Sequence, residues 1–314
     1  MWGYVLRRLL ATVPVMGVVV LVVFLILRLT PGDPAAVIAG DYASAADIAR
    51  IRSQLGLDRP LLEQFLTWLA QVLRGDLGTS IFTNLPVTTL IAQRLEPTLL
   101  LALTTITFSV LVAVPLGTLA AWRAGGLLDR CVMLFSVAGF SVPVFVLGYL
   151  LIYLFAMGLQ LLPVQGYRSP FTDGLGPFLR HIALPTLTLG TVFVALIARM
   201  TRATVMDVLH EDHVRTARAK GQHELRVMTR HVLRNAAVPI VTVIGLGVAL
   251  LIGGVVVTES VYNIPGLGRL VLDAVLKRDY PIIQGLIILF SFVYILINLV
   301  IDLVYTLFDP RIRY

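Results

Sequence analysis

The chain alternates between long apolar runs and short polar segments. Each apolar run is close to or above the roughly 17–25 residues that a helix needs to cross a bilayer. The pattern therefore predicts an all-α, polytopic membrane protein with six transmembrane helices, which form a single transmembrane domain over residues 1–314. The runs, none of which contains a charged side chain, are 9–27, 97–122, 131–167, 182–198, 235–258 and 280–301.

The third apolar run is ambiguous because it contains 37 residues, too many for one span and few for two spans with a turn. We interpret it as one tilted span from Cys131 to about Met157, followed by a segment that lies at the far interface. Gly139 and Pro143 predict a kink in this span. Small residues and kinks serve helix packing in membranes, so these two residues belong either to a solute path or to ordinary packing.

Charge predicts the orientation of the chain. Hydrophobic residues make up 58% of the sequence and charged residues 14%, which excludes a soluble domain. With six spans, the segments on the side of the two chain ends hold 14 of the 25 Lys and Arg residues and 7 of the 18 acidic residues. Their net charge is +7, and the opposite segments sum to zero. The positive-inside rule places both termini in the cytoplasm, so the basic composition reflects topology and does not indicate nucleic-acid binding.

Residues 30–96 form the one sizeable polar segment on the outer side. We expect an external helical cap here, between the first and second transmembrane helices. Proline in a first turn and glycine just past a last turn mark the clearest of its helices. The expected helices cover residues 45–55, 60–74 and 86–95, and Pro97 is expected to stop the third.

Residues 206–234 form a polar, basic segment on the inner side. Two helices are expected, the first with Asp212 as its N-cap and Gly221 as the left-handed residue that ends it. The second begins near His223 and continues into the next apolar run. Basic residues favour the last turn of the first helix, and here they are Arg215, Arg218 and Lys220. Small residues are expected on the side that contacts a partner, namely Thr216, Ala217 and Ala219.

Within this segment, RTARAKG followed by RHVLRNA resembles the coupling loop of binding-protein-dependent ABC importer permeases. The general pattern of that loop is Glu-Ala-Ala, three residues, Gly, nine residues, then Ile-x-Leu-Pro. Ala217, Gly221 and Leu233 are in register with it. The positions that differ are Arg215, Thr216, His231 and Arg234. In these differences the segment looks like the variant found in dipeptide, oligopeptide, glutathione and nickel permeases.

The resemblance extends along the whole chain. Eight short motifs occur in the order typical of the peptide and nickel importer permeases. Each motif is weak by itself, and their common order makes the resemblance specific. They are YVLRRLL, RLTPGDPA, LGLDRPL, GDLGTS, the coupling segment, PGLGRL, RDYP and DPRIRY.

The resemblance implies a type I ABC importer permease in the bacterial cytoplasmic membrane. Such a chain is one half of a heterodimer with a second permease subunit, and it works with two ATP-binding subunits and an external solute-binding protein. ATP and Mg²⁺ would bind to those ATPase subunits, and no cofactor to this chain. The implied substrates are short peptides, with glutathione or nickel chelates as alternatives. The residues implied to couple to the ATPases are Asp212, Arg215, Thr216, Ala217, Ala219, Lys220 and Gly221.

The helix expected over residues 60–74 carries an apolar face at helical spacing. Its opposite face is polar, and under the resemblance it either docks the solute-binding protein or belongs to a lid that merely packs. The candidate docking residues are Glu63, Gln64, Thr67 and Gln71.

Glu259 lies at the outer end of the fifth apolar run, next to the turn NIPGLGR. Ionisable residues near the membrane are costly and often functional. Two interpretations are open: Glu259 lines or gates the solute path, together with Gly139 and Pro143, or it has a structural role, for example as a partner of Arg269.

Other classes of protein have less support in the sequence. No GxxxxGK[ST] phosphate loop and no Ser-His-Asp set is present, so the chain has no recognisable means of hydrolysing ATP and is not expected to be an enzyme. His210, Glu211 and His213 fall one residue short of the zinc-protease spacing, and no metal site is expected. An ion-coupled secondary transporter would need ionisable residues inside its spans, which the apolar runs lack.

Overall fold

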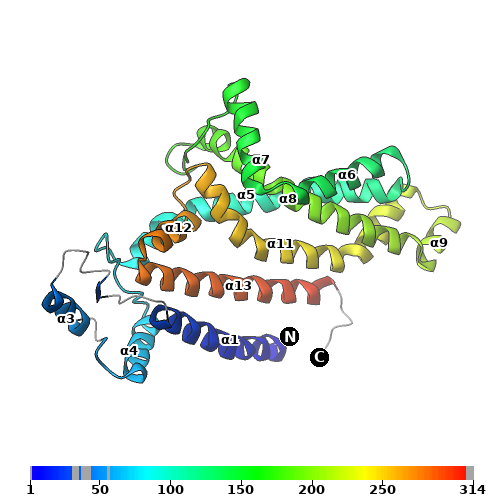
Figure 1. Cartoon of the computed structure of the whole chain (residues 1–314). Coiled ribbons are helices and arrows are strands. Elements are labelled where there is room, and N and C mark those ends of the chain that lie inside the picture. The colour runs from blue at the N-terminus through cyan, green and yellow to red at the C-terminus, as the bar shows by residue number, and fades with distance from the viewer. Residues whose placement is uncertain (1, 30–34, 37–43, 55–56, 309–314) are drawn as a thin grey trace. The chain divides into compact units, whose positions relative to one another are not determined.

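The computed structural model describes residues 2–29, 35–36, 44–54 and 57–308 (Figure 1). Within them the chain is helical almost throughout, and its β structure is limited to one isolated bridge between Thr79 and Pro86. The expected all-α class is therefore confirmed. The helices form two compact units.

The larger unit comprises Glu96–Arg269 and the end of the chain from Leu296. Helices α6 and α11 both pack along α8, which is the central element of this unit (Figure 1). Its helices are α5 (Val87–Trp122, from Glu96 onward), α6 (Leu127–Ser141), α7 (Val144–Leu151), η1 (Ile152–Gly158), α8 (Leu175–Leu209), α9 (Asp212–Ala219), α10 (Glu224–Arg226), η2 (Val227–Val232) and α11 (Leu233–Val261).

The smaller unit comprises residues 2–95 and Leu270–Ile295. Aromatic rings join α1 to α4 in this unit, because Phe24 lies 5.1 Å from Phe65 and 5.7 Å from Trp68 between ring centroids. The Ser80 hydroxyl donates to the buried Asp279 carboxylate at 2.5 Å. Its helices are α1 (Trp2–Leu29), α3 (Ala45–Gln54), α4 (Leu61–Leu73), the start of α5, most of α12 (Leu267–Lys277) and the first part of α13 (Tyr280–Phe308).

Four helices in the described residues are long and apolar enough to cross a membrane, or five if the bent α6 and α7–η1 pair is one span. They correspond to α5, α8, the continuous helix Glu224–Val261 and α13. Helix α1 has 28 residues and covers the first apolar run.

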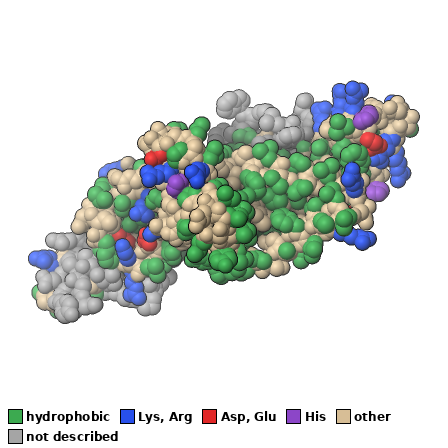
Figure 2. Space-filling model, turned by 90° about the horizontal axis from the view of Figure 1, so that it is seen from above, with side chains coloured by type: hydrophobic (Ala, Val, Ile, Leu, Met, Phe, Trp, Pro, Cys, Tyr) green, Lys and Arg blue, Asp and Glu red, His purple; other side chains and the backbone are tan. Residues whose placement is uncertain are grey.

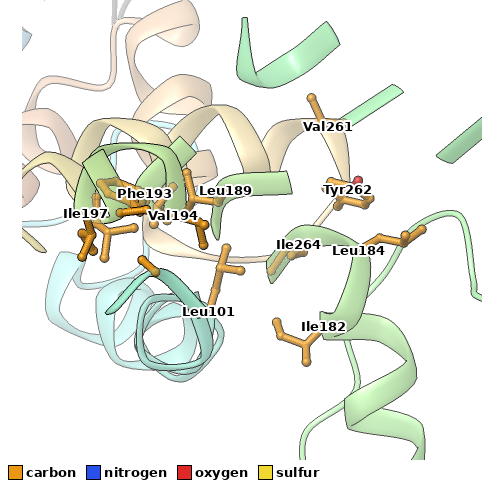
Figure 3. Packing of buried hydrophobic residues seen from close by; sticks show 14 of the residues in the cluster. Leu101, Ile182, Leu184, Leu189, Phe193, Val194, Ile197, Val261, Tyr262 and Ile264 are labelled. Carbon is orange, nitrogen blue, oxygen red and sulfur yellow. The ribbon is translucent and has the colours of Figure 1, made fainter. Parts of the chain in front are cut away.

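The core of the larger unit forms along α8. One face of α8 presents Leu189, Phe193 and Ile197, which pack toward Leu101 of α5 and toward residues that follow α11 (Figure 3). Tyr262 is 1% exposed and its hydroxyl lies 2.7 Å from the Thr188 hydroxyl. The apolar stripe of α8 thus holds together helices that are far apart in the sequence.

Pro97 does not stop a helix, contrary to the expectation. The outer helix expected over 86–95 and the second apolar run form one continuous 36-residue helix, α5, and Pro97 is buried inside it. Proline removes a single backbone donor, and in membrane proteins neighbouring helices and local adjustments satisfy the carbonyl that loses its partner. Packing has therefore outweighed the local signal.

The third apolar run is broken, not merely tilted or kinked. Helix α6 ends at Ser141, and α7 with η1 leaves it at 106° (Figure 1). Val142 is extended, with φ −90° and ψ 122°, and Pro143 is the N-cap of α7. A residue before proline disfavours the helical conformation, and proline has no N–H to continue the hydrogen-bonding ladder. The single span expected from Cys131 to Met157 is wrong in this respect.

Helices α3 and α4 match two of the three helices expected between residues 30 and 96, and position 55 of the first lies outside the described residues. Pro60 is the N-cap of α4, and Gly75 follows the helix with φ +82°. No residue of α4 is fully buried, and the apolar face that was expected to pack does so in part, through Phe65 and Trp68 against Phe24. Residues 30–34, which belong to the motif RLTPGDPA, lie outside the described residues.

Candidate functional site

Helix α9 occupies the middle of the predicted coupling segment, and its ends are locally determined. Glu211 is extended and acts as the N-cap without a side-chain bond, so the expected N-cap, Asp212, is instead the first helical residue. An acidic residue there still complements the helix dipole. At the other end Gly221 has φ +73°, as expected. The Gln222 N–H donates to the Ala217 carbonyl and the Gly221 N–H to the Arg218 carbonyl, which is the Schellman pattern.

Two faces of α9 have different surroundings. Val214 and Ala217 are 0% and 4% exposed, and they pack in an apolar cluster. The cluster draws its other members from the ends of α5 and α8, from η2 and from α11, and its buried residues are Ala121, Val205, Val208, Val227, Met228, Val232, Ala236 and Ile240. Because an eight-residue helix is unstable alone, this cluster holds α9 in place.

The opposite face of α9 is exposed. It carries residues at positions i, i+3, i+4 and i+7 of the helix, namely Asp212, Arg215, Thr216 and Ala219. Ala217 was expected on this face and belongs to the buried one. Thr216 and Ala219 do lie on the exposed face, so the helix presents two small residues between charged ones.

Charged side chains surround the exposed face. Lys, Arg and His side chains gather at the α9 end of the chain (Figure 2). An Arg215 guanidinium nitrogen lies 3.5 Å from the Asp212 carboxylate, and both side chains are mostly exposed. Arg218 donates to both Glu224 carboxylate oxygens, at 2.8 and 3.2 Å. Lys220 is exposed beside the Gly221 turn.

The second helix of the segment begins as expected. His223 is its N-cap, and the Leu225 N–H donates to His223 Nδ1 at 3.3 Å. From Glu224 the helix continues to Val261, but Val227–Val232 is π-helical. π-helical turns are uncommon and occur often at functional sites, and the sequence contained no signal for this one.

Glu259, the second candidate of the sequence, is a fully buried anchor. Its exposed fraction is 0%, Thr98 donates to Oε1 at 2.6 Å, and the Arg269 backbone N–H donates to Oε2 at 3.0 Å. The Leu267 N–H donates in turn to the Thr98 hydroxyl at 2.8 Å. The carboxylate and the hydroxyl thus satisfy N–H groups of the first turn of α12, as capping side chains do.

The geometry supports the structural interpretation of Glu259, in which the backbone N–H of Arg269 is a partner of the carboxylate. The Arg269 guanidinium donates to the Asn263 side-chain oxygen. A Cβ at Gly266 would overlap the Glu259 carboxyl group, so the turn wraps closely around the acid.

The other path candidates, Gly139 and Pro143, lie in and just after α6. A Cβ added to Gly139 would come within 2.8 Å of the Ala195 Cβ, so this glycine permits close contact between α6 and α8. Pro143 starts α7 after the break. Both positions have clear packing roles, and a role in a path stays a prediction.

The docking candidates on α4 differ in availability. Glu63 is paired with Arg59 at 3.0 Å, and both side chains are more than half exposed. Gln64 donates to the Leu57 and Arg59 carbonyls, so it holds the turn before the helix. Thr67 and Gln71 are exposed.

A buried ion pair that sequence reasoning missed fixes the short connection between α5 and α6. Asp129 is 4% exposed, and Arg202 of α8 donates to both of its carboxylate oxygens. The Gly125 N–H adds a third bond at 2.9 Å. The partners are 73 positions apart in the sequence, and no local pattern links them.

Removing Asp129 is expected to destabilise the protein because Arg202 would keep a poorly solvated charge. We expect Asp129→Ala to lower the free energy of unfolding by about 3 kcal/mol, the low end for a buried pair, since Arg202 keeps some exposure. Thermal unfolding in detergent measures the effect. The double variant Asp129→Leu/Arg202→Met should lose less than Asp129→Ala, and an equal or larger loss would contradict this account of the pair.

Comparison with known proteins defines the class. Residues 113–314 match the family described as the binding-protein-dependent transport system inner membrane component, and residues 1–102 match its N-terminal family. The chain therefore belongs to this family of ABC transporter permeases, and the resemblance inferred from the sequence is confirmed. The protein is accordingly a membrane component of a binding-protein-dependent transporter and not itself a catalytic enzyme.

Individual relatives match over the full length. The chain is 55% identical over 311 residues to a probable peptide ABC transporter permease of Sinorhizobium fredii, with 99% of each chain covered. It is 46% identical over 314 residues to the glutathione transport system permease GsiC of Escherichia coli K12, with 100% of each covered. The MetNI methionine ABC transporter, solved in inward-facing form, shares the fold: the TM-score is 0.60 at 16% identity, over 71% of this chain and 97% of that one.

Proposed function

We propose that this chain is the permease subunit through which an ATP-driven importer carries short peptides delivered by an external solute-binding protein. The observation that carries the proposal is the full-length similarity, at 55% identity, to a probable peptide ABC transporter permease. Helix α9 adds physical support, because it presents an exposed stripe of small and charged residues on a firmly packed base.

In this proposal the importer has two ATP-binding subunits, which hold the ATP and Mg²⁺ themselves, and α9 inserts into a cleft of one of them. The contact residues are those of the exposed stripe together with Lys220, while Ala217 and Gly221 shape the helix from within. A second permease subunit completes the translocation path as a heterodimer partner. The basic, exposed surface around α9 suits a large protein partner on the cytoplasmic side.

The proposal includes six spans with both termini in the cytoplasm. The broken α6 and α7–η1 pair counts as one span, and α1 as another. Support comes from the charge of +7 on one set of connecting segments and zero on the other. The segment at residues 30–96 then faces the outside, where the polar face of α4 is a docking surface for the binding protein.

Glutathione is a second candidate substrate, since GsiC, at 46% identity, is a glutathione transport system permease. Glutathione is itself a small peptide-like molecule, so a path wide enough for short peptides accommodates it.

Reconstituted transport tests the proposal. The chain is purified with its ATPase subunits and second permease subunit and placed in liposomes with ATP in the lumen and binding protein outside. We expect labelled di- and tripeptides to accumulate only when both ATP and the binding protein are present. Accumulation driven by an ion gradient without ATP would contradict the proposal, and accumulation of glutathione that peptides fail to inhibit would select the second candidate.

The same liposomes test the outer docking surface. The double variant Glu63→Arg/Gln71→Arg should raise the binding-protein concentration needed for half-maximal uptake while leaving the maximal rate unchanged. Uptake identical to that of the unmodified protein at limiting binding protein would exclude docking through the polar face of α4.

A further inference from the structure

Hydrogen bonds join α9 to the helix that follows it. Nε2 of His213 lies 3.0 Å from Nδ2 of Asn235, and the same amide nitrogen donates to the His231 carbonyl at 2.6 Å. An amide nitrogen only donates, so the 3.0 Å contact with Asn235 makes Nε2 of His213 the acceptor, and the His231 carbonyl lies farther from this nitrogen, at 3.4 Å. Nδ1 of His213 then carries the proton and faces the Glu211 carboxylate at 3.0 Å. Glu211 thereby fixes the ring so that its acceptor points at Asn235.

A second tie lies at the other end of α9. Arg218, in its last turn, makes the two-bond pair with Glu224. Beside it, the Gln222 side-chain oxygen lies 2.8 Å from Nε2 of His231. Paired bonds from a guanidinium fix the orientation as well as the distance of a carboxylate, so α9 is held at both ends.

The partners in these hydrogen bonds all lie on the helix that follows α9. Asn235, His231 and Glu224 all belong to the continuous helix Glu224–Val261. Among the residues that the structure describes, α9 makes no side-chain hydrogen bond to α8, and His210 at the end of α8 bonds within that helix, to the Met206 carbonyl at 2.7 Å. The contact of α9 with α8 is apolar only, through the cluster around Val214. Apolar contacts are non-directional and permit sliding more readily than paired hydrogen bonds do.

The π-helical turn lies between the two ties. Val227–Val232 follows Glu224 and precedes Asn235, so the bonds of α9 bracket the irregular turn on both sides. A π-helical turn closes its hydrogen bonds one residue later than an α-helix does, and any change in it rotates the helix beyond. Because α9 is bonded to this helix on both sides of the π-helical turn, a shift of α9 moves both sides together and is not taken up by a change in the turn.

We propose that His213 and Asn235 form a positioning pair which, together with Arg218–Glu224, makes α11 the helix that moves with α9. This inference rests on the proposed function, in which the ATPase subunits move α9. At its outer end α11 carries Glu259, which is bonded to Thr98 of α5 and to the first turn of α12. Movement of α11 therefore reaches the outer end of the same unit.

The test measures coupling in the reconstituted complex, as peptides imported per ATP hydrolysed. His213→Ala and Asn235→Ala should each lower this ratio by roughly five- to ten-fold, the size of a typical coupling between two sites. The complex should still assemble with its ATPases and hydrolyse ATP without binding protein at the usual rate. The double variant should lose no more than either single variant, because both changes remove the same bond.

Matched variants separate positioning from general stability. His210→Ala removes a histidine three positions earlier whose bond stays within α8, and Thr229→Ala removes an exposed bond in η2 to the Leu225 carbonyl. Both should couple normally. His213→Gln keeps a side-chain acceptor and should recover part of the ratio.

The outcomes are distinct. Normal coupling in His213→Ala would overturn the inference while leaving the proposed function intact. Loss of ATPase binding in this variant would also overturn it, because His213 would then contact the ATPase directly and not act by holding α9 to α11. An unmodified complex that imports nothing with ATP and binding protein would instead remove the proposed function itself.

Discussion

Replacing Ala217 with Asp is expected to detach α9 and abolish import. Ala217 is 4% exposed within the cluster that also buries Val214, Val227 and Met228. A carboxylate there would have no arranged partner, and burying an unpaired charge costs several kcal/mol. Since α9 is too short to be stable without its packing, the helix should leave the surface and the ATPases should lose their contact.

The companion variant Ala219→Asp separates packing from contact. Ala219 lies two positions further along α9, on the exposed face. Ala217→Asp should lower the thermal unfolding temperature of the chain in detergent and stop import. Ala219→Asp should leave the unfolding temperature unchanged and still reduce import and the stimulation of ATP hydrolysis by loaded binding protein. An unchanged unfolding temperature in Ala217→Asp would contradict the buried placement, and full import by Ala219→Asp would show that the exposed face is not the contact.

Gly266→Ala is expected to destabilise the larger unit around the turn between α11 and α12. An added methyl group would overlap the Glu259 carboxyl group. That group is held by the Thr98 hydroxyl and the Arg269 N–H, so moving it away from the added methyl group would strain or break these two bonds. Overpacking of this kind costs about 1–3 kcal/mol, and loss of the two bonds adds to it. Thermal unfolding of the purified chain measures the effect.

A double-mutant cycle identifies the cause. Glu259→Ala by itself should also destabilise, because it leaves the Arg269 N–H and the Thr98 hydroxyl without their acceptor, and an unsatisfied buried group costs about 1–3 kcal/mol. With the carboxylate gone, Gly266→Ala has nothing to overlap and should cost little more. The two losses should therefore be strongly non-additive. Additive losses would mean that Gly266 is needed for a reason other than the carboxylate.

The features that the sequence predicted correctly depend on neighbouring residues. Gly221 ends α9 in the left-handed conformation because that preference belongs to glycine itself. The long apolar runs became helices because the length and composition of a segment determine whether it suits lipid. The break after Ser141 was foreseen as a kink because Pro143 acts on its own backbone and on the residue before it, but the 106° bend was not.

The features that the sequence left open depend on partners far along the chain. The face of α9 that is buried follows from where α8 and η2 place their apolar residues, so Ala217 points inward although its neighbours in sequence suggested a contact surface. Pro97 stays inside α5 because packing compensates for one lost hydrogen bond.

For the buried polar groups, too, some features could be predicted from the sequence and others depend on the tertiary structure. The sequence identified Glu259 as unusual, since an acid beside an apolar run must find partners, yet only the tertiary structure showed that these partners include Thr98 and the backbone N–H of Arg269. Asp129 and Arg202 gave no local signal at all, because a pair separated by 73 positions is defined by how α6 meets α8. By itself the sequence determined the class of protein and its helical segments, because these follow from composition and motifs. The tertiary structure decided which side chains are anchors and which are exposed, because that depends on the surface each helix meets.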